Sequence, residues 1–210
     1  MLEYLIAGGP FMFGTLSVSI FVVAIFILRM SYLWRRAGKG ELLRSQVMQF
    51  VEERNYRNAI RVVSGNNSPL GKVLSAALVR ANRSEKEIRR AVESAAIEEI
   101  PKVRGATVYL PQLSNLATLL GLLGTIEGLI VTFQGASGES AAVRQEALAR
   151  GISIAFYNTF FGLLVATMGV IFYLILLART NAVLGLIERS AATVIDSLLW
   201  TREQPGKKSA

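Results

Sequence analysis

The chain has 210 residues, of which 52% are hydrophobic, and its mean hydropathy of +0.42 is high for a soluble protein. It contains no cysteine and no histidine, which excludes disulfides, thiol catalysis and the commonest metal sites, so we expect no metal and no cofactor. Of the 23 Lys and Arg residues, 16 lie between residues 29 and 104. This one-sided surplus follows the positive-inside rule of membrane proteins and argues against nucleic-acid binding.

Three stretches of the chain carry no charged residue: residues 4–28, 105–126 and 151–178. A helix needs roughly 20 apolar residues to cross the bilayer, so each stretch is long enough. The sequence therefore predicts an all-α integral membrane protein, with transmembrane helices within residues 1–34, 107–134 and 151–178.

The first predicted span ends in a typical membrane–water boundary, where Tyr32 and Trp34 precede Arg35 and Arg36. Because basic residues stay in the cytoplasm, we expect a periplasmic N-terminus, a cytoplasmic C-terminus and a multi-pass protein of the bacterial inner membrane. The remaining segments are then a cytoplasmic helical domain at 35–106, a periplasmic loop at 135–150, and a cytoplasmic C-terminal helix with a disordered tail at 179–210.

The cytoplasmic segment has helical patterning, so we expect long helices to extend from the membrane into this domain. Apolar residues recur at mostly helical spacing over 41–63, the GNNSP stretch at 65–69 breaks the pattern, and 70–81 resumes it. Ser84 and Glu87 are spaced as a capping box ahead of the next helix, which we expect Pro101 to kink or end.

Both later spans carry a stripe of small residues. On each helix the stripe repeats at intervals of four and three residues, which keeps its members on one face. Such stripes let helix backbones approach closely in lipid, and Gly124 is expected to add to this packing. The stripes consist of Ser114, Thr118, Gly121, Thr125, Gly128 and Thr132 on the second span, and Ala155, Thr159, Gly162, Ala166 and Gly169 on the third.

Two threonines of the stripes should lie at one depth. Thr125 lies nine residues inward from Gln134, and Thr159 lies eight residues inward from Gly151, so antiparallel helices place both roughly 12–14 Å below the outer surface. Asn158 joins them at this level. Two interpretations stay open: the hydroxyls serve packing alone, or they line a polar ion path.

Glu127 is a carboxylate inside an apolar run. It lies two residues after Thr125, about 200° around the helix, so it does not share the small stripe. A charge facing lipid there would cost several kcal/mol, so it should face protein or water, or be protonated. Either Glu127 belongs to a functional path, or it is hydrated or paired at the outer end of its helix.

The stretches GLLGTIEGLI (121–130) and ISIAFYNTFFGLLVA (152–166) together resemble the paired signatures of the MotA/TolQ/ExbB proton channel family, in its ExbB/TolQ-like three-helix branch. The opening AGGPFM and Arg29 at the inner end of the first helix are similar too. The chain departs from the pattern at Ile154, where many members carry glutamate, and at Glu127, where a Trp or another apolar residue is common.

The resemblance implies a pentamer around two copies of an ExbD/TolR-like single-span protein that carries a membrane Asp. It also implies a possible third, TonB/TolA-like energy transducer. Thr125 and Thr159 correspond to the family's pore threonines, and a flow of ions, expected to be protons, would drive work on the cell envelope. Two other classes stay open: a non-conducting membrane scaffold or sensor, and a transporter subunit or membrane enzyme, which no nucleotide loop or broken-helix pair supports.

Overall fold

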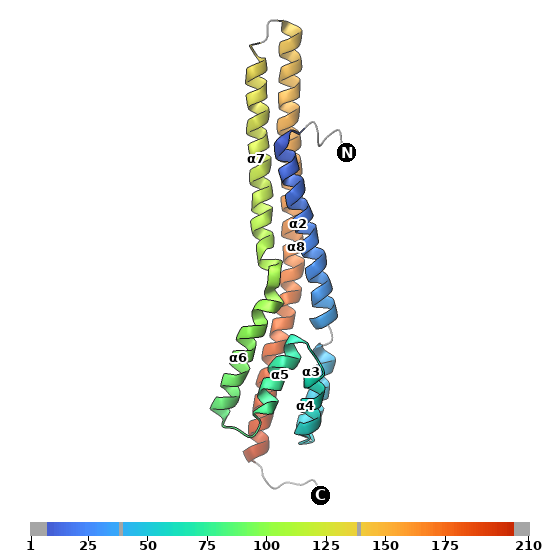
Figure 1. The fold of residues 1–210 in the computed structure, drawn as a ribbon, viewed down its shortest axis with the longest axis vertical. Coiled ribbons are helices and arrows are strands. Elements are labelled where there is room, and N and C mark those ends of the chain that lie inside the picture. The colour runs from blue at the N-terminus through green and yellow to red at the C-terminus, as the bar shows by residue number, and fades with distance from the viewer. Residues whose placement is uncertain (1–7, 38–39, 138–139, 204–210) are drawn as a thin grey trace. The chain divides into compact units, whose positions relative to one another are not determined.

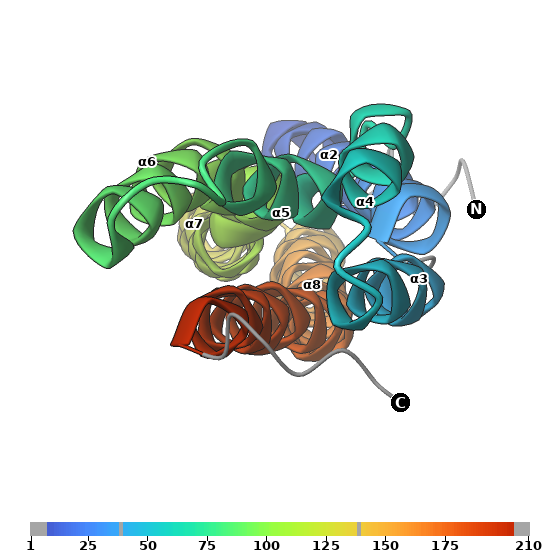
Figure 2. The ribbon, with the colours of Figure 1, turned by 90° about the horizontal axis from the view of Figure 1, so that it is seen from below.

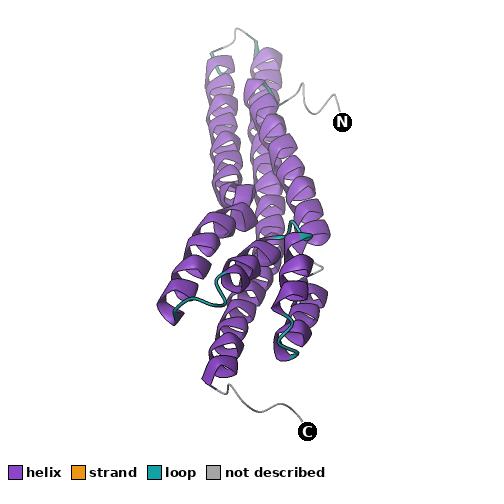
Figure 3. Cartoon of the chain, turned by 60° about the horizontal axis from the view of Figure 1, so that its bottom comes forward, coloured by secondary structure: helices purple, strands orange, loops and turns teal. Residues whose placement is uncertain are grey.

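The computed structural model describes residues 8–37, 40–137 and 140–203. Within these ranges every regular element is a helix and no strand is present, which confirms the all-α prediction (Figure 3). The chain divides into two compact units. One contains residues 1–28 and 106–176, and the other contains residues 29–105 and 177–210. We call them the apolar unit and the charged unit.

The apolar unit is built from α2 (Pro10–Tyr32), α7 (Leu110–Gly135) and the first part of α8 (Ala141–Glu203), which lie along one another (Figure 1). Pro10 occupies the first turn of α2, where its missing N–H is not needed. Gly9 before it has φ +75°, a conformation that favours glycine. Further along, the rings of Phe26 and Phe172 stack at 4.0 Å between α2 and α8.

Among the described residues, three helices are long and apolar enough to cross a membrane, as the sequence predicts. The candidate spans lie within Pro10–Glu52, Glu85–Gly135 and Ala141–Trp200, and only 22% to 28% of the most apolar window of each is buried inside the chain. Large apolar side chains such as Leu122, Phe133 and Phe156 remain exposed. Surfaces of this kind require lipid or other subunits around them, so the chain is a multi-pass membrane protein.

The third span is part of a much longer helix than expected. α8 is 63 residues long and is continuous from Ala141 to Glu203. The predicted loop at 135–150 is therefore helical from Ala141 onward. This stretch, AAVRQEALAR, is rich in strong helix formers, which explains why the helix continues beyond the apolar segment. The predicted disordered tail lies mostly outside the described residues.

The charged unit contains α3 (Gly40–Glu52), α4 (Tyr56–Ser64), α5 (Pro69–Val79), α6 (Glu85–Arg104) and the last part of α8, with a π-helical turn at Leu33–Ala37. α5 lies between α4 and α6 (Figure 2). The core of the charged unit consists of fully buried aliphatic side chains, among them Val47, Leu74, Leu78, Ile88 and Leu198.

Two details of the charged unit differ from the sequence prediction. The helix predicted over 41–63 is two helices, because Arg54 turns the chain at φ 56° and Asn55 caps α4 by accepting a hydrogen bond from the Asn58 N–H at 3.3 Å. Of the two effects predicted for Pro101, a kink and an end, the end does not occur there, because α6 continues to Arg104 and stops at Gly105, where φ is +45°. The predicted capping box of Ser84 and Glu87 is present.

The end of α6 is held by an arginine from the first span. The Arg29 guanidinium donates hydrogen bonds to the carbonyl oxygens of Lys102, at 3.4 Å, and of Val103. These carbonyls belong to the last turn of α6, where no intrahelical N–H is available. A short 3-10 turn, Gly105–Tyr109, then joins α6 to α7.

Candidate functional site

Glycines bring the backbones of α7 and α8 into direct contact. A Cβ atom on Gly162 would lie 2.8 Å from the Cα of Gly121 and 2.9 Å from the Ala117 carbonyl oxygen. One on Gly128 would lie 2.6 Å from the Ala155 backbone nitrogen. Only glycine fits at such distances, so the two stripes face each other. Ala166 lies one turn beyond Gly162 on the same stripe and is half-buried.

The same close approach joins Thr125 and Thr159. Their Oγ1 atoms lie 2.5 Å apart, across α7 and α8, and both side chains are half-buried. Each hydroxyl is also 3.0 Å from a carbonyl oxygen of its own helix, that of Gly121 for Thr125 and that of Ala155 for Thr159. The structure therefore brings together the two threonines that their sequence depths align.

The threonine pair makes one oxygen–oxygen contact more than it has hydroxyl protons to bridge such contacts. Three oxygen–oxygen contacts run from the Gly121 carbonyl through Thr125 and Thr159 to the Ala155 carbonyl, and two protons serve them. Each hydroxyl can donate once and accept twice, so one contact lacks a donor at any time. A protonated group from outside the chain can donate to the pair, and the two protons can then reorient.

The neighbouring hydroxyls on α7 behave differently. Ser114, Thr118 and Thr132 each donate to the carbonyl oxygen four residues earlier, at 2.9–3.2 Å. Among the described hydroxyls of α7, the one of Thr125 is alone in meeting a hydroxyl of α8. The threonine pair is therefore distinct from the general habit of membrane hydroxyls to bond their own helix.

Asn158 makes its side-chain hydrogen bonds with other residues than the threonine pair. Its side chain is fully buried, and its Nδ2 donates to the Gly8 carbonyl at 2.5 Å and to the Ile154 carbonyl at 3.0 Å. A Cβ atom on Gly124 would overlap the Asn158 side chain, so this glycine provides the space for it. Asn158 thus links α8, α7 and the residues that precede α2.

Glu127 also faces the start of α2. Its Oε2 lies 3.0 Å from the place of a Cβ atom on Gly9, and Oε2 itself is buried. The four residues predicted for an ion path therefore form two groups: Thr125 and Thr159, which contact each other, and Glu127 and Asn158, which each reach the residues before α2. The sequence prediction overlooked that Gly8 and Gly9 belong to the second group; the GGP tripeptide before the first apolar run was the available signal.

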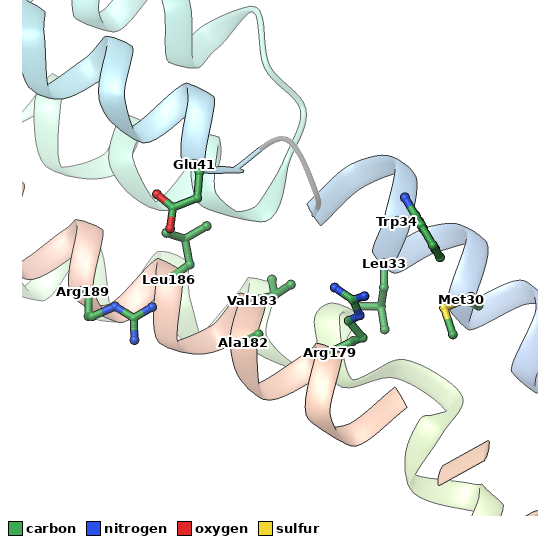
Figure 4. A pocket seen from close by; sticks show the side chains of 9 residues that line it. All are labelled: Met30, Leu33, Trp34, Glu41, Arg179, Ala182, Val183, Leu186 and Arg189. Carbon is green, nitrogen blue, oxygen red and sulfur yellow. The ribbon is translucent and has the colours of Figure 1, made fainter. Parts of the chain in front are cut away.

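A pocket of about 450 Å³ lies in the charged unit and shares no residue with either group (Figure 4). Trp34 and Arg179 line one part of it, with the guanidinium 5.8 Å from the ring centroid. Arg179 is the first charged residue after the third apolar run. Aromatic and basic residues of this kind are typical of a membrane–water boundary.

The chain matches known proteins over most of its length. Residues 65–189 match the model of the MotA/TolQ/ExbB proton channel family. A putative biopolymer transport protein, ExbB-like 3, from Synechocystis is 31% identical over 79% of this chain and 80% of its own. ExbB-like 1 from the same organism is 30% identical over 85% and 71%, and an ExbB homolog from Methanothermobacter thermautotrophicus is 26% identical over 90% and 67%. The chain therefore belongs to the MotA/TolQ/ExbB proton channel family, whose members are channel proteins and not enzymes.

Proposed function

We propose that this chain is the ion-conducting stator subunit of an inner-membrane motor, and that Thr125 and Thr159 form part of its proton path. The observation that carries the proposal is the 2.5 Å contact between their hydroxyls inside two otherwise apolar helices. Together with the Gly121 and Ala155 carbonyls, the two hydroxyls form a row of hydrogen-bonding oxygens. Each hydroxyl in this row can accept a proton from one side and donate one to the other.

The threonines alone cannot carry the charge, because a hydroxyl does not titrate near neutral pH. A proton path through apolar helices needs an acid that loads and releases the proton. We infer that this acid comes from an ExbD/TolR-like partner with one span and a membrane Asp, and that this chain assembles as a pentamer around it. The exposed apolar faces of α7 and α8 supply surface for such an assembly.

The direction of work follows from the charge distribution. With residues 29–104 in the cytoplasm and the turn between α7 and α8 in the periplasm, protons would enter from the periplasmic side. One charge crossing the membrane releases about 2.3 kcal/mol per 100 mV. We propose that this energy drives biopolymer transport or a related task at the cell envelope, through a third TonB/TolA-like protein.

The test is proton uptake by liposomes that contain the chain together with an ExbD/TolR-like single-span protein. Thr159→Val removes the hydroxyl and keeps the shape, so we expect proton flux to be lost. Thr159→Ser restores a hydroxyl and should retain flux. Thr118→Val is the matched control, because the Thr118 hydroxyl bonds its own helix, to the Ser114 carbonyl.

The alternative is a scaffold that conducts no ion and uses the stripes only for assembly. It predicts that Thr159→Val and Thr118→Val behave alike in every assay. Native mass spectrometry of the co-purified proteins separates the two functions further, since five copies with two partner chains support the stator. A monomer or dimer that ignores the partner contradicts it.

A further inference from the structure

The pocket of about 450 Å³ in the charged unit lies where two apolar runs of the sequence end (Figure 4). Arg179 is the first residue after the charge-free stretch 151–178, and Met30 is the second residue after the stretch 4–28. The pocket therefore lies at a membrane–water boundary, and its volume falls within the range of about 300–1,000 Å³ of small-molecule sites. Its apolar lining consists of Met30, Leu33, Trp34, Ala182, Val183 and Leu186.

The pocket extends along α8, and Arg179 and Leu186 line different parts of it. The Arg179 guanidinium lies 5.8 Å from the ring centroid of Trp34. Leu186 instead packs against the start of α3, because a Cβ atom on Gly40 would lie 2.6 Å from the Leu186 Cδ2 atom. Leu186 follows Arg179 by seven residues, which an α-helix spans in about 10 Å. Two parts of one elongated ligand can therefore bind at different positions along the pocket.

The charged lining of the pocket has a net positive charge. It consists of Arg179, Arg189 and Glu41. Both arginines are exposed, and no carboxylate of the described residues forms an ion pair with either of them. The Glu41 carboxylate pairs with Arg44 at 3.6 Å and is 70% exposed. Because the planar guanidinium matches the geometry of phosphate, an arginine without a carboxylate partner at a membrane boundary favours a phosphate group.

We propose that this pocket binds an anionic phospholipid, with its phosphate on Arg179 and its headgroup directed along α8 toward Glu41. The exposed ring of Trp34 beside Arg179 is typical of residues at the level of lipid headgroups. Basic pockets at such a boundary can bind anionic headgroups. The headgroup beyond the phosphate should carry hydroxyl donors, as in phosphatidylglycerol, because the Glu41 carboxylate accepts hydrogen bonds and repels a second negative charge.

The apolar lining favours a lipid over a soluble phosphate compound. Met30 is half-buried and Ala182 is exposed, so the glycerol backbone and the first carbons of an acyl chain can cover accessible apolar surface there. A lipid also reaches this boundary without leaving the bilayer. The pocket shares no residue with the pair Thr125 and Thr159, so the inference goes beyond the proposed function.

The test is binding of dioleoylphosphatidylglycerol to the full-length protein, purified in detergent and stripped of its native lipid. Thermal unfolding at increasing lipid concentration gives an apparent Kd, because a ligand of the folded state raises the Tm. Dioleoylphosphatidylcholine is the control lipid, since it has the same acyl chains but neither a net charge nor a hydroxyl donor. We expect it to bind about tenfold more weakly, and we expect sodium phosphate alone to leave the Tm unchanged.

Two variants locate the lipid in the pocket. Arg179→Gln removes the charge that binds the phosphate, so we expect about tenfold weaker binding of dioleoylphosphatidylglycerol. Arg35→Gln is the matched control, because Arg35 is an exposed arginine near the same boundary that does not line the pocket. Ala182→Phe fills the pocket from an exposed position without altering any charge, and should abolish binding. Native mass spectrometry counts the lipids that each variant retains.

Equal affinities of the wild-type protein, Arg179→Gln and Ala182→Phe would overturn the lipid site. Equal binding of the two lipids, or a Tm shift of the same size with sodium phosphate alone, would overturn it as well. If Ala182→Phe changed the number of copies in the assembly and left lipid retention unchanged, a second copy of this chain would occupy the pocket instead. The proposed function is tested separately: loss of proton flux in Thr159→Val would stand without this lipid, and lipid binding would stand if the chain conducted no ion.

Discussion

Within each of the two units of this chain, the helices are packed against one another in a different way. In the apolar unit, helices meet through backbone, as at Gly121 and Gly162, and large side chains such as Leu122 point outward. In the charged unit, large side chains such as Leu74 and Ile88 fill the interior, and ion pairs and hydrogen bonds of charged side chains join its helices. In lipid the hydrophobic effect does not favour contact between helices, so close van der Waals packing must stabilise it. In water the hydrophobic effect favours the burial of leucine side chains.

The largest effect should come from a single methyl group in the apolar unit. In Gly162→Ala the new Cβ would lie 2.8 Å from the Gly121 Cα and 2.9 Å from a carbonyl oxygen, and backbone atoms cannot move aside cheaply. We expect a loss of about 1–3 kcal/mol in the free energy of unfolding, as in overpacked interiors. Thermal unfolding in detergent, with native mass spectrometry of the assembly, measures it.

Gly14→Ala is the matched control on α2. Its Cβ would meet only side-chain carbons of Leu120, at 3.5 Å, which is an ordinary contact. Because alanine also favours helix over glycine, we expect a Tm at or above that of the wild-type protein. Equal losses in the two variants would show that backbone contact does not hold α7 to α8.

An effect of similar size concerns the arginine that binds the end of α6. Arg29→Gln removes the guanidinium that donates to the carbonyls of Lys102 and Val103, and leaves both carbonyls without this donor next to Gly105. Hydrogen bonds from a charged group contribute about 1.5–3 kcal/mol, so hydrogen–deuterium exchange should quicken over the last turns of α6. Arg35→Gln removes an exposed charge six residues on and should leave exchange in α6 unchanged.

Much of this architecture could be predicted from the sequence, and the part that could not has a physical reason. Charge-free length indicates the three spans, and the four–three spacing indicates the stripe that contains Thr125. These are periodic signals within one helix. The contact between Glu127 and Gly9, or between Arg29 and Val103, joins residues far apart in the chain, and no local pattern encodes it. The turn at Arg54 lacks the glycine or proline that usually marks a helix break.

A smaller effect should come from two adjacent acids that share one lysine. The Lys102 ammonium lies 2.7 Å from carboxylate oxygens of both Glu98 and Glu99, and Lys72 lies 3.0 Å from Glu99. The Glu99 side chain is 5% exposed and that of Glu98 is 73% exposed. We expect Glu99→Gln to cost about 1–2 kcal/mol and Glu98→Gln less than about 0.5 kcal/mol, because water screens the exposed pair.

The same cluster predicts a dependence on acid. Burial raises the pKa of Glu99, but hydrogen bonds from Lys102 and Lys72, with their charges, outweigh it, so the pKa is lowered overall. Because the pKa of Glu99 is lower in the folded protein, its carboxylate stabilises the fold fully at a pH above its pKa in the unfolded chain. This stabilisation disappears as the pH falls through its pKa in the folded protein. Acid should therefore quicken exchange in α5 and α6 of the wild-type protein. A wild-type response no larger than that of Glu99→Gln would contradict the role of this carboxylate.

The smallest effect should come from the capping box that starts α6. Ser84 Oγ accepts from the Glu87 N–H at 3.4 Å, and Glu87 Oε2 accepts from the Ser84 N–H at 3.0 Å. Hydrogen bonds from the Ser84 side chain, then from its backbone, lower the pKa of Glu87. We expect Ser84→Ala to cost about 1 kcal/mol and to quicken exchange in the first turn of α6. Ser94→Ala, on the exposed face of the same helix, should slow exchange slightly because alanine is the better helix former. If hydrogen–deuterium exchange changed equally along α6 in both variants, intrinsic helix propensity would determine the stability of α6. The hydrogen bonds and ion pairs of polar side chains would then contribute less to the charged unit than we infer from its comparison with the apolar unit.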